Sequence, residues 1–185
     1  MKQCVFLERD GILNQPRGGQ RMAGSPLTLG EFKIHSEVAP LLHELKAAGF
    51  LLIVTTNQPG LSDGSLSRRE LEYMHDALKR AFPLDDIMVC PHEEMDRCTC
   101  RKPKPGMLLE AAHNWRLDLS RSFIISNKWP DAEAARRAGV TALMLQSPWL
   151  GRDHHDFVLP DLPTLVEKLL QLSSPALALA GAEAF

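Results

Sequence analysis

The chain has 185 residues, enough for one domain with a sizeable core. Hydrophobic residues make up 44% and charged residues 24% of it, which excludes a chain that is disordered throughout. Its 21 Lys and Arg residues nearly balance 23 Asp and Glu residues, and a net charge of −2 argues against a broad nucleic-acid-binding surface. No apolar run approaches the roughly 20 residues needed to span a bilayer, and no signal-peptide pattern opens the chain. We therefore expect a monomeric, cytoplasmic protein that binds neither membranes nor nucleic acid.

The first quarter of the chain predicts a strand, a long loop, a helix and a second strand. Residues 3–8 (QCVFLE) form a short apolar run that ends in charge. Residues 9–36 are rich in Gly, Pro and Ser without a period, which predicts a loop over a functional region. Ser36 has the character of an N-cap for a helix over residues 37–48. The apolar, β-branched run 50–55 (FLLIVT) predicts a buried strand.

The same alternation continues to the last quarter of the chain. Ser67 and Glu70 have the spacing of a capping box, which predicts a helix that ends before Pro83. Further strands are expected at residues 86–90, 122–126 and 140–145, and further helices at residues 106–116, 130–138 and 161–172. Residues 173–185 are rich in Ala, Leu and Ser, so we expect a frayed tail behind a single domain of residues 1–172.

This order of elements predicts an α/β fold. We expect a three-layer, Rossmann-like parallel sheet with helices on both faces and right-handed crossovers. In such sheets ligands bind beyond the carboxyl ends of the strands. Polar clusters follow four of the predicted strands, at residues 8–10, 55–58, 90–104 and 127–131. The functional site is therefore expected at this edge of the sheet.

Three of the four cysteines lie within eleven residues beside a histidine, in the pattern C-x-H-x5-C-x-C. The four residues are Cys90, His92, Cys98 and Cys100. Three thiolates and one imidazole form the ligand set of a closed, structural zinc site, so we predict a zinc-stabilised loop over residues 90–105. The alternative is a set of incidental loop thiols. Cys4 lies in a predicted strand, where a role in the core is expected.

A basic segment stiffened by two prolines follows the last of these cysteines. Its Arg101 and Lys102 suit a phosphate ester, with the guanidinium as a fork and the ammonium as a point charge. The hydroxyls and amides of residues 55–58 (TTNQ) can hold phosphoryl oxygens. Glu8 and Asp10 form a carboxylate pair suited to Mg²⁺ binding and proton transfer. A solvated basic loop and a simple turn are the plainer alternatives.

Taken together, these segments resemble the haloacid dehalogenase (HAD) phosphatase superfamily, and in particular its small zinc-containing branch. That branch holds the heptose bisphosphate phosphatases and the histidinol-phosphate phosphatase domain. FLERDGILN is similar to the FLDRDGTIN of the branch, VTTNQPGL to its VTNQSGI, and SNKWPDAEAARRAGV to its GDKxxDxxAAxxAGV. CPHEEMDRCTCRKPKPGM resembles its zinc loop running into the phosphate-binding lysine. The resemblance covers about residues 3–146 and implies a HAD-like fold without a large cap domain.

The resemblance also implies a mechanism through a phosphorylated carboxylate, with Mg²⁺ and a structural Zn²⁺. The carboxylate of Glu8 would attack phosphorus, and Asp10 would protonate the leaving oxygen and then activate water. Thr56 and Lys102 would hold the transferring phosphoryl group. Mg²⁺ would be held by Glu8, the backbone carbonyl of Asp10, and Asn127. Contacts with the substrate are implied for Asn57, Gln58, Arg101 and Lys128.

Two positions depart from the family pattern. Glu8 stands where the family has Asp, and Asn127 stands where the fourth motif has Asp. The extra methylene of Glu8 moves its carboxylate forward by roughly 1–1.5 Å, and a misplacement of about 1 Å can cost roughly 10²-fold in rate. Asn127 keeps an oxygen for the cation but removes one negative charge, so the affinity for Mg²⁺ should fall.

Three functions fit these observations. The first is hydrolysis of a phosphomonoester of a small phosphorylated sugar, a heptose bisphosphate in particular, with weakened activity. A histidinol-phosphate phosphatase is the nearest enzymatic alternative. The second is a catalytically silent relative that binds a phosphorylated ligand or a partner, which Glu8 and Asn127 favour. The third is a purely structural zinc domain.

Overall fold

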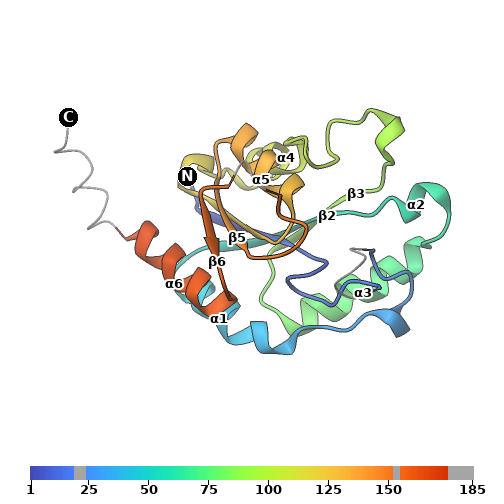
Figure 1. Cartoon of the computed structure of the whole chain (residues 1–185), viewed down its shortest axis with the longest axis horizontal. Coiled ribbons are helices and arrows are strands. Elements are labelled where there is room, and N and C mark those ends of the chain that lie inside the picture. Colours follow the sequence, from blue (N-terminus) through green and yellow to red (C-terminus); the bar gives the residue numbers. More distant parts are fainter. Residues whose placement is uncertain (19–23, 152–154, 175–185) are drawn as a thin grey trace.

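The computed structural model describes residues 1–18, 24–151 and 155–174. The strands of this part of the chain form one parallel sheet in the order β3-β2-β1-β4-β5-β6 (Figure 1). They are β1 (Cys4–Glu8), β2 (Leu51–Asn57), β3 (Asp86–Cys90), β4 (Phe123–Ser126), β5 (Thr141–Leu145) and β6 (Phe157–Leu159). The predicted α/β fold with a parallel sheet is confirmed.

Helices cover both faces of the sheet (Figure 1). One face carries α4 (Gly106–Trp115) and α5 (Trp129–Ala138), and the other carries α1 (Ala39–Ala47), α3 (Arg68–Ala81) and α6 (Leu162–Ser173). The shorter elements are the one-turn helix α2 (Gly60–Asp63) and the 3₁₀ turns η2 (Leu29–Glu31), η3 (Ser36–Val38), η4 (Glu94–Asp96) and η5 (Leu119–Arg121). The three predicted layers are therefore present.

The central strand β1 contributes to two separate cores. Val5 and Leu7 pack with residues of α1, α3 and α6, whereas Cys4 and Phe6 pack with residues of α4 and α5. This division follows from the period of two along a strand, which points successive side chains to opposite faces. Cys4 is fully buried, so its predicted place in the core is confirmed. Burial on both faces fixes the register of β1 and hence the position of Glu8 at its end.

The structure differs from the sequence prediction at β6 and at the start of α1. The sequence does not predict β6, which has three residues and is defined by its pairing with β5. The predicted start of a helix at residue 37 with Ser36 as its cap is wrong. The amide of Val38 donates to the carbonyl of His35 at 3.0 Å, which makes a 3₁₀ turn, and α1 begins only at Ala39.

The capping box predicted for α3 forms only in part. The amide of Glu70 donates to Ser67 Oγ at 3.1 Å, as expected for the N-cap. The carboxylate of Glu70 instead accepts a hydrogen bond from the amide of Leu29, at 2.6 Å. This contact ties the η2 turn of the long first loop to α3.

None of the helices in the described residues is long and apolar enough to cross a membrane. The last of them, α6, ends at Ser173. Beyond Ser174, the predicted tail of residues 173–185 lies outside the described residues, as do residues 19–23 of the predicted first loop.

Candidate functional site

A buried network of charged side chains lies at the carboxyl edge of the sheet, where β1 ends. The side chain of Glu8 is 4% exposed, and Lys102 Nζ donates to its Oε2. Lys102 Nζ also donates to Asp131 Oδ1 at 2.6 Å and to the carbonyl of Thr55 at 2.8 Å. Lys128 Nζ lies 3.3 Å from Glu8 Oε1. The structure thus brings together residues that follow four different strands.

The two carboxyl groups of this network differ in their pKa. Burial alone would raise the pKa of Glu8, but Lys102 and Lys128 outweigh it and hold this pKa below its ordinary value. Burial would lower the pKa of Lys102, but Asp131 and Glu8 hold it above its usual range. For Asp131, burial and the charge of Glu8 outweigh Lys102 and raise the pKa to about 6. Glu8 is therefore ionised over a wider range of pH than Asp131, as a nucleophile requires.

Asp10 lies beside this network with both carboxylate oxygens hydrogen-bonded. Arg9 donates to it through two nitrogens at 3.0 and 3.2 Å, and Ser25 Oγ donates at 2.7 Å. Gln58 Nε2 donates at 3.1 Å and Asn14 Nδ2 at 3.0 Å. Burial would raise the pKa of Asp10, but Arg9 outweighs it and lowers this pKa to about 2. In this arrangement Asp10 is ionised and can act as a base.

A cavity of about 250 Å³, here called the catalytic cavity, opens onto the network. Its lining consists of Glu8, Gly24, Ser25, Asn57, Pro59, Arg101, Lys102, Lys128, Pro130 and Asp131. Thr56 and Gln58 are buried outside this lining, with Gln58 Nε2 donating to Thr56 Oγ1 at 2.7 Å. Asn57 binds the backbone N–H and C=O of Lys102, each at 3.2 Å. Arg101, Asn57 and Lys128 are thus the predicted substrate residues that reach the cavity.

Asn127 follows β4 and meets the turn after β1. A Cβ on Gly11 would lie 2.7 Å from Asn127 Nδ2, and the φ of Gly11 is +106°, so only glycine fits there. Asn127 is 5% exposed, and its Oδ1 has no hydrogen-bond partner among the described residues. A buried oxygen without a donor suits a hard cation. By ligand type, the oxygens of Glu8, the carbonyl of Asp10, and Asn127 would suit Mg²⁺, although Asn127 is not among the residues that line the catalytic cavity.

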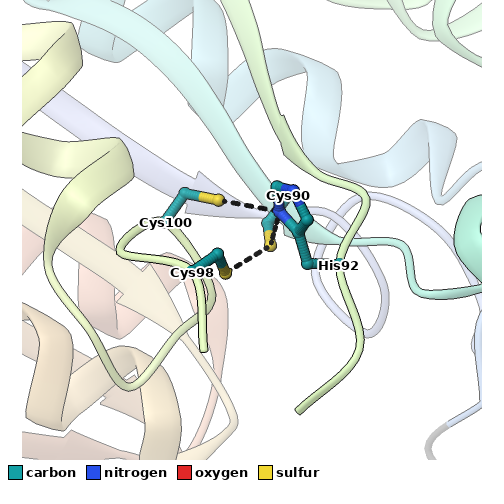
Figure 2. A group of neighbouring side chains, drawn as sticks. All are labelled: Cys90, His92, Cys98 and Cys100. Atoms are coloured by element: carbon teal, nitrogen blue, oxygen red, sulfur yellow. Dashed lines mark hydrogen bonds between the residues drawn. The ribbon is translucent and has the colours of Figure 1, made fainter. Parts of the chain in front are cut away.

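The four predicted zinc ligands lie together, and Figure 2 shows their side chains pointing toward one another. Cys90 Sγ lies 3.8 Å from Cys98 Sγ and 3.6 Å from His92 Nδ1, and Cys100 Sγ lies 3.3 Å from His92 Nδ1. Zn–S bonds of about 2.3 Å at tetrahedral angles imply S–S distances of about 3.8 Å. Burial raises the pKa of the Cys90 thiol to about 12, so a cation is needed to hold it as thiolate. The cluster can hold a metal ion, and its ligand set fits zinc.

The loop that carries this cluster also carries the basic residues of the site. The amide of Arg101 donates to Cys98 Sγ at 3.4 Å, and its Nη1 donates to the carbonyl of His92 at 3.0 Å. Lys104 Nζ donates to the carbonyl of Cys98. The cluster and the basic segment from Arg101 to Lys104 are therefore one structural unit.

Apart from Gln58, sequence reasoning missed the residues that surround Asp10. Arg9 is fully buried, lies 5.5 Å from the ring centre of Phe32, and has its Nη1 3.3 Å from His75 Nε2. Burial and Arg9 lower the pKa of His75 to about 3, so this imidazole is neutral. Arg9 carried a signal, since an arginine between two carboxylates belongs to the first motif. Ser25 lies in the long first loop and His75 in helix α3, and only the fold brings them to the site.

Known proteins resemble this chain in both sequence and fold. Residues 99–165 match the family described as HAD-hydrolase-like. The D-glycero-beta-D-manno-heptose-1,7-bisphosphate 7-phosphatase of Pasteurella multocida (strain Pm70) is 34% identical, over 91% of this chain and 99% of its own length. The chain belongs to the heptose bisphosphate phosphatase family.

Another member of this family, from Escherichia coli (strain K12), is 33% identical over 77% of this chain and 78% of its own length. The crystal structure of the D,D-heptose 1,7-bisphosphate phosphatase of B. bronchiseptica, complexed with magnesium and phosphate, is also similar. It has 29% sequence identity and a TM-score of 0.79, and the match covers 93% of this chain and 99% of that protein. The predicted HAD resemblance is therefore confirmed.

Proposed function

We propose that this chain hydrolyses a phosphomonoester of a phosphorylated sugar, with heptose 1,7-bisphosphate as its substrate, and that Glu8 is the nucleophile. The observation that carries the proposal is the ionised carboxylate of Glu8 at a cavity lined by Arg101, Lys102 and Lys128. Rigidly held cations around a carboxylate suit phosphoryl transfer, which depends on positioning and charge stabilisation. The heptose bisphosphate phosphatases among its relatives support this substrate over histidinol phosphate.

The proposed reaction has two steps. A carboxylate oxygen of Glu8 forms a bond to phosphorus while the bond between phosphorus and the sugar oxygen breaks, and the sugar oxygen takes a proton from Asp10. Asp10 gains that proton on substrate binding, because the nearby phosphate dianion raises its pKa. Water then attacks phosphorus, Asp10 takes a proton from the water, and the Glu8 carboxylate leaves. Glu8, the carbonyl of Asp10, and Asn127 would hold Mg²⁺, which would supply positive charge near the phosphoryl oxygens.

Zinc in the cysteine–histidine cluster has a structural role in this proposal, because four protein ligands leave no position for a catalytic water. We propose a monomer with its catalytic cavity completed by its own chain. The reduced thiols that zinc needs also fit a cytoplasmic location.

The test is phosphate release from a panel that includes heptose 1,7-bisphosphate and histidinol phosphate. We expect slow turnover by the chain as it stands, because the carboxylate of Glu8 sits one methylene too far forward. The double variant Glu8→Asp, Asn127→Asp should turn over the substrate roughly 10²-fold faster, or more, than the unmodified chain. This gain should exceed the product of the gains of the two single variants, because both side chains share one cation.

The control is Glu8→Ala, which should release no phosphate with either residue at position 127. Turnover by the unmodified chain at typical rates of roughly 1–10³ s⁻¹ would contradict the weakening that we ascribe to Glu8 and Asn127. No release by the unmodified chain or by the double variant, from any compound of the panel, would overturn the proposed activity.

A second candidate function is binding of a phosphorylated ligand without turnover. The balance of charge around the proposed Mg²⁺ ligands favours this function. Three carboxylates lie there, and they are paired with three basic side chains. The carboxylates are Glu8, Asp10 and Asp131, and the basic residues are Arg9, Lys102 and Lys128. With Asn127 neutral, this centre carries no surplus negative charge for Mg²⁺. Calorimetry distinguishes the two functions: under the second, inorganic phosphate binds the unmodified chain although no ester of the panel is hydrolysed.

A further inference from the structure

A second cavity, of about 390 Å³, opens between the cluster-bearing loop and helix α5. We call it the outer groove. It shares four lining residues with the catalytic cavity: Asn57, Arg101, Lys102 and Pro130. A ligand whose phosphate lies against Lys102 can therefore extend into the outer groove without leaving the protein surface.

One face of α5 borders this groove. Trp129, Glu133 and Arg137 follow one another at intervals of four residues, which places them on the same side of the helix. Trp129 and Arg137 line the groove, and Trp129 is 47% exposed although its indole is the largest apolar side chain of α5. Arg137 Nε donates to Glu133 Oε1 at 2.6 Å, which orients the guanidinium. An exposed aromatic ring beside an oriented arginine is a suitable surface for a ligand that is both apolar and anionic.

The charges of the groove favour an anion. Four basic residues line it against two acidic ones, Glu93 and Glu94. Lys102 and Lys104 already donate to Glu8, Asp131 and the carbonyl of Cys98. Arg101 and Arg137 are the remaining two basic residues, and a guanidinium has five N–H donors. The single nitrogens that they use on His92 and Glu133 leave donors for a phosphate.

We propose that the outer groove binds the non-reacting, phosphorylated end of the substrate. Trp129 packs against a C–H face of the sugar, and Arg137 together with Arg101 binds the second phosphate. This inference rests on the proposed function. It adds that Trp129 and Arg137 determine which substrates the site accepts. The groove selects a bisphosphate over a monophosphate, because only the bisphosphate satisfies both arginines and Lys102 at once.

The experiment compares Arg137→Gln with Arg136→Gln in the full chain. Arg136 also pairs with Glu133, at 2.8 Å, but it does not line the groove, so it controls for the loss of that ion pair. Calorimetry with heptose 1,7-bisphosphate and with inorganic phosphate is the readout. We expect Arg137→Gln to weaken bisphosphate binding by roughly 10-fold with phosphate affinity unchanged, since a charge-assisted bidentate contact is lost. Arg136→Gln should change neither affinity.

Trp129→Leu is the second variant, and it should weaken bisphosphate binding but not phosphate binding. The proposed role of the outer groove would be overturned if all three variants bound the bisphosphate as tightly as the unmodified chain. It would also be overturned if Arg137→Gln or Trp129→Leu weakened the binding of bisphosphate and of phosphate equally. The outcome for the proposed function is separate. Binding that depends on Arg137 without any hydrolysis overturns the phosphatase and supports the groove. If the chain hydrolyses the bisphosphate but Arg137→Gln does not change the KM, the proposed role of the outer groove is overturned and the proposed phosphatase activity stands.

Discussion

Lys102 is a buried cation whose three N–H donors all meet acceptors. Two of these acceptors are the carboxylates of Glu8 and Asp131, and the third is the carbonyl of Thr55. Burial of an ammonium group costs several kcal/mol unless such partners are present. Asn57 fixes the backbone of the same residue from both sides. Lys102 is therefore held rigidly by groups of β1, β2 and α5 before any ligand arrives.

We expect Lys102→Met to destabilise the fold by about 3–5 kcal/mol, because it leaves two buried carboxylates facing each other. The loss should depend on pH. The pKa of Asp131 is about 6 in the folded chain against an ordinary value of 3.8, and removal of Lys102 raises it further. A raised carboxyl pKa favours the folded state below pH 4, and this advantage disappears as the pH rises through the folded pKa. Urea unfolding should therefore show a larger loss at pH 8 than at pH 5.

Lys128→Met is the matched control for this variant. The side chain of Lys128 is 18% exposed, and its one ion pair in the described residues is with Glu8. We expect a smaller loss of unfolding free energy, with little dependence on pH over the same range. Equal losses for the two variants at both pH values would contradict the role given to Lys102.

Among the elements, the loop between β3 and α4 combines the cysteine–histidine cluster with the basic segment from Arg101 to Lys104. Cys90 ends β3, and Gly106 begins α4. Within the loop, the amide of Gly106 donates to the carbonyl of Thr99 at 3.2 Å, and the amide of Arg101 donates to Cys98 Sγ. A cation that holds the thiolates also holds these backbone contacts, so metal binding and the geometry of Arg101 are coupled.

Cys98→Ser should lose the metal and loosen the segment from Arg101 to Lys104. The measurements are zinc content by atomic spectroscopy, expected to fall from one ion per chain to none, and trypsin cleavage after Arg101, expected to speed up. Cys4→Ala is the control, because Cys4 is buried in β1 and takes no part in the cluster. It should keep one zinc ion. A full zinc content in Cys98→Ser would show that the cluster does not bind zinc as described.

Gly106→Ala tests the close approach of α4 to this loop. A Cβ at residue 106 would lie 2.3 Å from the carbonyl oxygen of Thr99, closer than any real contact, so backbone must shift. We expect a loss of about 1–3 kcal/mol of unfolding free energy and weaker zinc binding, measured by chelator competition. Gly30→Ala is the control, because its Cβ would meet Thr28 Oγ1 at an ordinary 3.8 Å. Similar zinc affinities in the two variants would contradict the coupling.

The elements that the sequence predicts are those with a local signal. Apolar runs predict five of the strands, and the spacing of the three cysteines and one histidine predicts the metal-binding loop. The strand β6 has no such signal, because three residues acquire their structure by pairing with β5. The contacts of Asp10 with Ser25, and of Arg9 with His75, join residues 15 and 66 positions apart, so no local pattern encodes them. Likewise, the spacing of four residues between Trp129, Glu133 and Arg137 predicts that they share a helix face, but it does not predict the groove beside that face.

For the molecule as a whole, the site joins the parts of the sheet. Glu8 ends β1, Asn57 ends β2, Asn127 follows β4, and Lys102 comes from the loop after β3. These ends meet where the strand order turns back between β1 and β4. A ligand in the catalytic cavity therefore contacts residues from both halves of the sheet, on either side of the boundary between β1 and β4. Binding should then stabilise the chain as a unit rather than one loop of it.

The thermal unfolding of the full chain tests this coupling and the cation site together. A ligand that binds only the folded chain stabilises it by about 2.7 kcal/mol at a concentration of 100 Kd. For a chain of this size, about 2–4 °C per kcal/mol gives a rise in Tm of roughly 5–10 °C. We expect this rise with inorganic phosphate, and its loss in Lys102→Met. With Mg²⁺ alone the rise should be small, but larger in Asn127→Asp, because the added carboxylate supplies the negative charge that the centre lacks. An equal Mg²⁺ effect with Asn and with Asp at position 127 would mean that the charge of this side chain does not set the cation affinity.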